Sequence, residues 1–114
     1  MTAPERMRRV DEAMREVLSD AITSDLKDPR VGFVTVTAVN TSTDLRNARV
    51  YVSVLGDDKA RRLSMKALEN AHGFLQRRVA AQLRLKHTPQ LAFVYDDTAE
   101  KADRLERLLG SDGA

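Results

Sequence analysis

A strongly basic segment occupies residues 59–87 and has the composition of a surface that binds phosphate groups. It contains one acid, Glu69, and eight basic residues: Lys59, Arg61, Arg62, Lys66, Arg77, Arg78, Arg84 and Lys86. Acids outnumber bases both before and after this segment, so the net charge of the whole chain is only +2. A solvated helical face normally mixes both signs, because opposite charges at helical spacing stabilise the helix. A run almost free of acids therefore favours contact with a polyanion such as a nucleic acid.

Part of this segment has a spacing that would place its polar groups along one side of a helix. The positions recur every three or four residues: Lys59, Arg62, Lys66, Asn70, Gly73 and Arg77. A helix break near residues 71–73 would also free backbone amides at the start of the next helix, a natural place for an anion. We predict that RNA phosphates contact this stripe and its neighbours Arg61, Ala71, His72 and Arg78. The alternative is a solvated surface with a kink that serves packing only.

Basic residues outside the stripe could have structural roles rather than RNA contacts. Arg46 and Arg49 begin a predicted strand, where they form either a second RNA contact or only pairs with neighbouring strands. Arg30 is expected to pair with a nearby acid or to cap a turn. Arg84 and Lys86 are expected near a helix C-terminus, where the helix dipole favours cations. A structural role is the better interpretation for Arg30, Arg84 and Lys86.

No group of residues predicts catalysis, a metal site or a cofactor. The chain has no cysteine, which excludes a disulfide framework and a thiolate metal site. His72 and His87 lack a third ligand at a suitable spacing. Asp96 and Asp97 could be read as paired catalytic carboxylates, but their place before Thr98 favours helix capping. The glycines form no nucleotide-binding loop, and the few aromatic residues argue against extensive base stacking.

The pattern of apolar residues predicts the elements that carry these groups. Spacings of three and four predict a helix from Pro4 to about Leu26. Runs of β-branched residues at 31–40 and 47–56 predict a hairpin, and residues 91–96 a third strand. Between them, two helices meet near residues 71–73, because two apolar stripes point in different directions: Ala60, Leu63, Ala67 and Ala71, then Leu75, Val79 and Leu83. Residues 98–109 predict a short helix, with 110–114 frayed.

The resulting order, α-β-β-α-α-β plus a short helix, predicts an α+β fold with helices covering one face of a three-stranded sheet. The long connection between the second and third strands allows them to be parallel. A length of 114 residues predicts one domain over residues 1–114, with its core at about 5–98. No apolar run approaches the ~20 residues of a membrane span, and the N-terminus does not have the pattern of a signal peptide.

Three stretches carry a family resemblance: DPRVGFVTVTAVNTSTDLRNARVYVSVLG (28–56), NAHGFLQRRVA (70–80) and LRLKHTPQLAFVYDDT (83–98). From about Arg6 to Leu109 the sequence resembles the ribosome-binding factor A family, which has the bacterial, type II KH-like fold. In that family the kink is an Ala-x-Gly, matched here by Ala71-His72-Gly73. It replaces the GxxG loop with which other KH domains clamp single strands. No such loop joins the two helices here, which favours recognition of a folded RNA surface.

The resemblance implies a non-catalytic assembly factor for the free 30S ribosomal subunit. Such a factor binds 16S rRNA late in maturation, near the 5′-terminal helix, and supports growth in the cold. The resemblance also implies a cytoplasmic monomer without cofactor and a functional link to ribosome-assembly GTPases. The sequence stops soon after Leu109, so we expect no contact that depends on the longer basic tail of some relatives. Alternatives are a generic KH-like RNA chaperone or regulatory RNA-binding protein without a ribosomal target, and a small enzyme acting on RNA or nucleotides.

Overall fold

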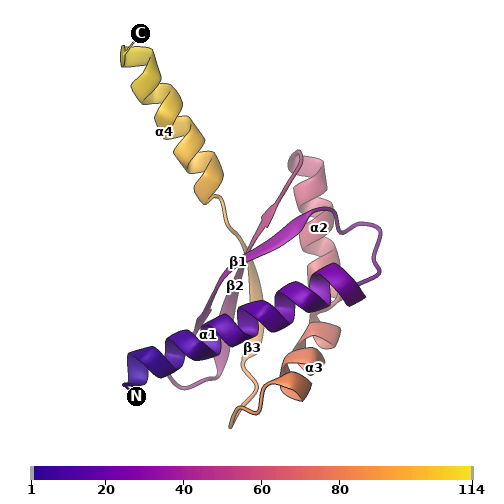
Figure 1. Ribbon diagram of the computed structural model, residues 1–114. Coiled ribbons are helices and arrows are strands. Elements are labelled where there is room, and N and C mark those ends of the chain that lie inside the picture. The colour runs from indigo at the N-terminus through magenta and orange to yellow at the C-terminus, as the bar shows by residue number, and fades with distance from the viewer. Residues whose placement is uncertain (1, 114) are drawn as a thin grey trace.

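The computed structural model describes residues 2–113, and the side chains as far as Gly110. Ala114 and Met1 lie outside the described residues. The elements follow the predicted order: α1 (Ala3–Asp20), a π-helical turn η1 (Ala21–Asp25), β1 (Val34–Thr41), β2 (Asn47–Val54), α2 (Asp58–Asn70), α3 (His72–Gln82), β3 (Gln90–Tyr95) and α4 (Thr98–Gly113). Figure 1 shows α1, α2 and α3 grouped around the sheet, whereas α4 leaves it at the end of β3.

The first helix begins and ends where its sequence predicts. The hydroxyl of Thr2 accepts a hydrogen bond from the Glu5 amide, and Pro4 lies in the first turn. The final turn widens into η1, in which the Leu26 amide donates to the Ala21 carbonyl at 2.9 Å. The chain then becomes extended at Leu26, ahead of Pro29, which disfavours a helical conformation in the residue before it.

The strands of the described chain form a mixed sheet in the order β1-β2-β3. β1 and β2 are antiparallel, while β2 and β3 are parallel, as the long helical connection allows. Alternate residues of β2 are buried, from Ala48 to Val54, and this face packs against the helices. We call the opposite face, which has no helix over it, the open face of the sheet.

The core lies between the inner face of the sheet and the first three helices. Met14 and Leu18 of α1 meet Leu68 of α2 and Leu75 and Val79 of α3 in one cluster with the inward residues of all three strands. These five side chains are fully buried. The prediction of helices covering one face of the sheet is confirmed.

The prediction of an apolar stripe through Leu63 is wrong. Leu63 is 40% exposed, and Ser64 and Leu68 occupy buried positions instead. Ser64 is accepted there because its hydroxyl donates to the Arg30 carbonyl and accepts from the Gly32 amide. The sequence pattern cannot reveal these partners, which come from the loop before β1.

Two helix ends also differ from the predictions. α3 ends at Gln82 because Leu83 is extended and partly buried against the core, so Arg84 and Lys86 lie on a loop rather than at a helix C-terminus. α4 continues to Gly113 instead of ending near Leu109 and fraying. No proline follows Leu109 to stop the helix, and a glycine raises its energy without breaking it.

Candidate nucleic-acid interface

The residues of the predicted stripe lie on the exposed sides of α2 and α3. We call this stripe the cationic face, and its residues Lys59, Arg62, Lys66, Asn70, Gly73 and Arg77 are all exposed. Among the described residues, none of its four cations has a carboxylate within ion-pair distance. Glu69 is also exposed nearby but does not pair with them. The cationic face therefore presents four positive charges that remain available for an external anion.

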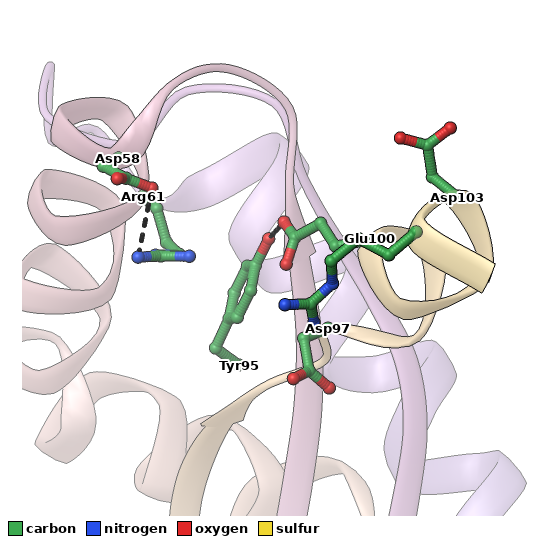
Figure 2. Close-up of a pocket in the computed structure, with 7 residues that line it drawn as sticks. Asp58, Arg61, Tyr95, Asp97, Glu100 and Asp103 are labelled. Carbon is green, nitrogen blue, oxygen red and sulfur yellow. Dashed lines mark hydrogen bonds and ion pairs between the residues drawn. The ribbon is translucent and has the colours of Figure 1, made fainter. Parts of the chain in front are cut away.

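Two other arginines of the basic segment have partners inside the protein. Arg61 lies 3.2 Å from the Asp58 carboxylate, and its guanidinium is 4.9 Å from the centroid of the Tyr95 ring (Figure 2). Arg78 pairs with Asp25 at the end of the first helix and stacks 5.1 Å from the Phe74 centroid. These contacts stabilise the packing of α2 and α3, so Arg61 and Arg78 are less available to RNA than their sequence position suggests.

The bend between α2 and α3 lies at Ala71, not at the glycine. Ala71 has φ −88° and ψ 5°, which ends α2, whereas Gly73 is an ordinary helical residue of α3. No side chain caps the start of α3, so its first amides have no side-chain acceptor within the described residues. A Cβ atom on Gly73 would lie 3.3 Å from Nη1 of Arg77. Gly73 is therefore not held by a special backbone angle, and a side chain there would require only a small shift of the exposed, flexible Arg77 side chain.

His72, predicted as an RNA contact, is bound within the protein instead. Its Nε2 donates to the Leu91 carbonyl of β3 at 2.9 Å, and its ring meets Phe93 edge to face. One turn later, the Gln76 side chain accepts from the Leu91 amide and donates to the Pro89 carbonyl. His72 and Gln76 together bind α3 to the start of β3, and the sequence carries no local signal for this arrangement.

Replacing His72 by alanine is expected to lower stability by about 1–2 kcal/mol, because the Leu91 carbonyl loses its side-chain donor. RNA affinity should change little once the comparison is made under conditions where both proteins are folded. Urea unfolding and a filter-binding titration measure the two quantities. A large loss of affinity without a loss of stability would instead show that His72 contacts RNA.

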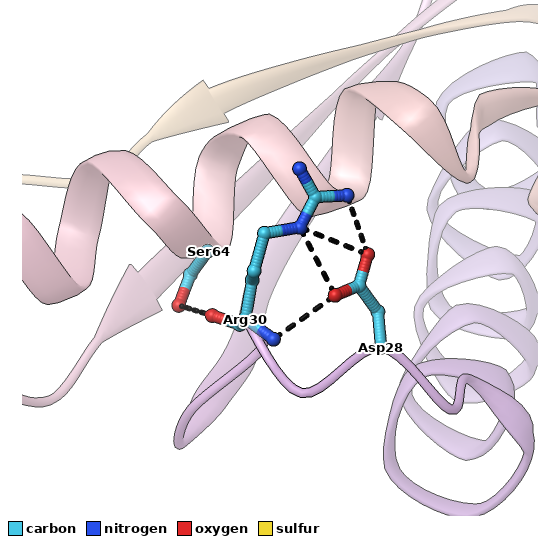
Figure 3. Close-up of polar contacts among 3 residues, drawn as sticks. All are labelled: Asp28, Arg30 and Ser64. Carbon is cyan, nitrogen blue, oxygen red and sulfur yellow. Dashed lines mark hydrogen bonds and ion pairs between the residues drawn. The ribbon is translucent and has the colours of Figure 1, made fainter.

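A polar anchor holds the loop before β1 against α2 (Figure 3). Arg30 pairs with Asp28, the nearby acid that the sequence predicts, whereas its contacts with Ser64 and Asn70 of α2 have no signal in the sequence. The Arg30 guanidinium donates to both carboxylate oxygens of Asp28, and the Arg30 amide donates to Asp28 Oδ1 at 2.9 Å. Arg30 also reaches Asn70, whose amide oxygen accepts from Nη2 at 2.9 Å when that amide is turned toward it. Asn70, predicted as an RNA contact, thus has an internal partner, and the charge of Arg30 is neutralised by Asp28.

The hydrogen bonds from the Arg30 side chain, and then from its amide, lower the pKa of Asp28 from 3.8 to about 2. The Asp28 contribution to stability is therefore fully present above pH 4 and is lost as the pH falls toward 2. Arg30→Ala should return the pKa of Asp28 toward its ordinary value, which a carboxyl NMR titration would measure. An unchanged pKa would show that the ion pair does not persist in solution.

The remaining predicted contacts, Arg46 and Arg49, lie away from the cationic face. Arg49 projects from β2 on the open face, where it stands between Asn40 of β1 and Ala92 of β3. Arg46 is exposed in the hairpin loop, 3.9 Å from Asp44. The sheet separates Arg49 from α2 and α3, so these arginines form a second surface rather than an extension of the first.

The acidic residues around the start of α4 are close together, and several of them have partners within the protein. Asp58, Asp97, Glu100 and Asp103 line a shallow depression with Arg61, Arg104 and Tyr95 (Figure 2). Asp97 pairs with Lys101, and Tyr95 donates to Glu100. Asp96 caps α4 by accepting from the Thr98 amide, as predicted, and hydrogen bonds from Thr98 and Thr37 lower its pKa. Within residues 2–113 no cluster of metal-ligating side chains is present.

An α-β-β-α-α-β order with a bent, cationic helix pair over one side of the sheet defines a KH-like RNA-binding domain. In the described part of the chain, no helix is both long and apolar enough to cross a bilayer. The family model of ribosome-binding factor A matches residues 6–109, and the chain belongs to that family.

Individual relatives agree with this assignment. Ribosome-binding factor A of Anaeromyxobacter sp. (strain K) is 50% identical over 110 residues, covering 96% of this chain and 80% of the relative. The crystal structure of ribosome-binding factor A from Thermus thermophilus has a TM-score of 0.69 and 27% identity, covering 78% of this chain and 94% of that one. A Thermus thermophilus homology model of ribosome-binding factor A was fitted into a cryo-EM map of its 30S complex. It has a TM-score of 0.62 and 28% identity, covering 75% of this chain and 90% of that one.

Proposed function

We propose that this protein binds the free 30S ribosomal subunit by placing its cationic face along 16S rRNA phosphates. The observation that carries the proposal is the line of four exposed cations without internal partners among the described residues, Lys59, Arg62, Lys66 and Arg77. Each cation that neutralises a phosphate releases counterions, which supplies affinity without reading sequence. The similar Thermus thermophilus protein fitted into a 30S complex supports the choice of target.

The bend at Ala71 suits a folded RNA surface better than an extended strand. A straight helix can contact a curved RNA backbone only over a short length. Two helices joined at an angle can contact a longer stretch of the same backbone. The uncapped amides of α3 add donors for a phosphate at the bend. No glycine loop is present between α2 and α3 to clamp single-stranded bases. These features support contact with a structured element, for which we propose the region near the 5′-terminal helix of the rRNA.

The proposed mechanism is thermodynamic and needs no catalysis. By binding one conformation of the immature rRNA more tightly than others, the protein shifts the population toward that conformation. While bound, it also blocks premature use of the subunit by occupying its surface. Release then follows when the completed fold, or an energy-using assembly GTPase, favours a competing state. This role places the protein in the cytoplasm as a monomer acting on late 30S particles.

Sedimentation tests the target directly. The protein should co-sediment with free 30S subunits, and less with 70S ribosomes or with unrelated structured RNA of similar length at equal salt. Chemical footprinting of immature 30S particles should then show protection confined to one rRNA region. Equal binding to every RNA would instead support the alternative of a generic KH-like chaperone. Turnover of labelled RNA in magnesium would support the enzyme alternative.

A further inference from the structure

The C-terminal helix α4 carries an apolar side that nothing in the described chain covers. Leu105, Leu108 and Leu109 are between 57% and 69% exposed, and Ala102 precedes Leu105 and Leu109 on the same side of the helix, with Leu108 at its edge. Figure 1 shows α4 pointing away from the sheet. The radius of gyration is 16.2 Å, against about 13 Å expected for a compact domain of this length. Exposing these leucines to water costs free energy. A conformation in which another surface covers them would therefore be favoured over the extended one.

The open face of the sheet has the composition of a surface that a helix can cover. The outward residues of its strands are Thr35, Thr37, Ala38, Asn40, Asn47, Arg49, Tyr51, Ser53, Gln90, Ala92 and Val94. Arg49 is the one charged residue among them in the described strands. At the end nearest α4, Phe33 and Leu55 are 79% and 74% exposed. Most of this face is polar, as is usual for a solvated sheet face, but its apolar members Ala92 and Val94 of β3 are exposed beside Phe33 and Leu55 at the end nearest α4.

The dimensions of helix and sheet match. The 16 residues of α4 extend about 24 Å, and the eight residues of β2 about 26 Å. The base of α4 is already beside this face, since Ala99 and Glu100 line a depression together with Phe33 and Leu55. Only residues 96–97 separate β3 from α4, so a change of backbone angle there would redirect the whole helix.

We propose that α4 is a lid that folds back about residues 96–97 and lays its leucines on the open face. Leu105 lies about 10 Å along α4 from Thr98. Ala92 lies three residues, also about 10 Å, back along β3 from Tyr95. Folding α4 back therefore brings Leu105 level with Ala92, and brings Glu106 level with Arg49, which pairs with Ala92 in the sheet register. In this closed position Leu105 would lie on Ala92 of β3, and Glu106 would lie close enough to Arg49 for an ion pair.

The same chain is a better occupant of this face than a second copy. A two-residue linker presents α4 at an effective concentration in the millimolar range, far above ordinary protein concentrations. The extended position is held by few contacts: the Tyr95 hydroxyl donates to Glu100, and the Thr37 hydroxyl donates to Asp96 at 2.7 Å. Closure would cover Arg49, so an RNA contact by Arg49 and closure of the lid exclude one another. The lid itself does not depend on the proposed ribosomal target.

A cysteine pair tests the lid cleanly, because the natural chain contains no cysteine. In the double variant Ala92→Cys and Leu105→Cys, mild oxidation should form a disulfide within one molecule, giving a faster-migrating monomer. The matched control pairs Leu105→Cys with Leu63→Cys, an exposed leucine on α2. X-ray scattering of the oxidised double variant should give a radius of gyration near 13 Å, and the natural chain should lie between that value and 16.2 Å.

Three results would overturn the proposal. Oxidation no faster than in the control pair would show that α4 does not reach the open face. Disulfides formed only between molecules would assign the open face to a second copy. A natural chain whose radius of gyration stays at 16.2 Å, and is unchanged when Leu105, Leu108 and Leu109 are replaced by serine, would show that the extended helix is the resting state.

Discussion

Replacing Arg62, Lys66 and Arg77 together by alanine should weaken binding to immature 30S particles roughly 100-fold at about 0.15 M salt. Each lost phosphate contact should also reduce the slope of log K against log salt by up to ~0.9, giving a total near ~2.7. The three side chains are exposed and have no carboxylate partner within the described residues, so their charge is available to RNA. Titrations at several salt concentrations measure both quantities.

The matched control removes three exposed cations elsewhere, with Arg6→Ala, Arg9→Ala and Arg104→Ala, and changes the net charge by the same amount. It should retain most of the affinity and of the salt dependence. Equal losses in both variants would mean that net charge, rather than the cationic face, drives binding. Stability should stay within about ±0.5 kcal/mol for the interface variant, since surface substitutions seldom exceed that range.

Leu68→Ala should lower the free energy of unfolding by about 3 kcal/mol. Leu68 is fully buried between α2 and the sheet, so truncation removes buried apolar surface and leaves a cavity. Stability of a domain is only about 5–15 kcal/mol, so this single change would move the urea midpoint substantially. Circular dichroism during urea titration is the measurement.

Leu63→Ala is the control, because it is the same substitution five residues earlier on the same helix. Leu63 is 40% exposed, so the loss there should stay below about 1 kcal/mol. A loss at Leu63 equal to that at Leu68 would place both leucines in the core and contradict the orientation of α2. RNA binding by the folded fraction should be unaffected by Leu68→Ala, since that side chain does not reach the cationic face.

The sequence correctly predicts which cations are exposed together on one side of the helices, but it does not predict which individual cations pair within the protein. Lys59, Arg62, Lys66 and Arg77 are exposed together because spacings of three and four define a side of a helix before any tertiary contact forms. Arg61 is adjacent to Arg62 in the sequence, but its side chain pairs with Asp58 and stacks on the Tyr95 ring. Those partners lie on other turns and strands, so local spacing cannot identify them.

Contacts with distant segments also decide the roles of His72 and Asn70. Their positions at the bend made RNA contact a reasonable prediction. In the folded chain, however, a carbonyl of β3 accepts from His72, and Arg30 reaches Asn70 from the loop before β1. Both partners are distant in sequence, and a polar side chain takes whichever partner the fold brings near it.

The sequence by itself determined the order of helices and strands, the bend between α2 and α3, the family and the concentration of positive charge. Hydrophobic period, capping residues and charge are properties of neighbouring residues, and they act before the chain is packed. Only the tertiary structure decided that Leu68 rather than Leu63 is buried, that Arg61 and Arg78 are internally paired, and that α4 stands apart from an uncovered sheet. Each of these outcomes depends on contacts between segments far apart in the chain, where packing and hydrogen bonding select among side chains that look equivalent in the sequence.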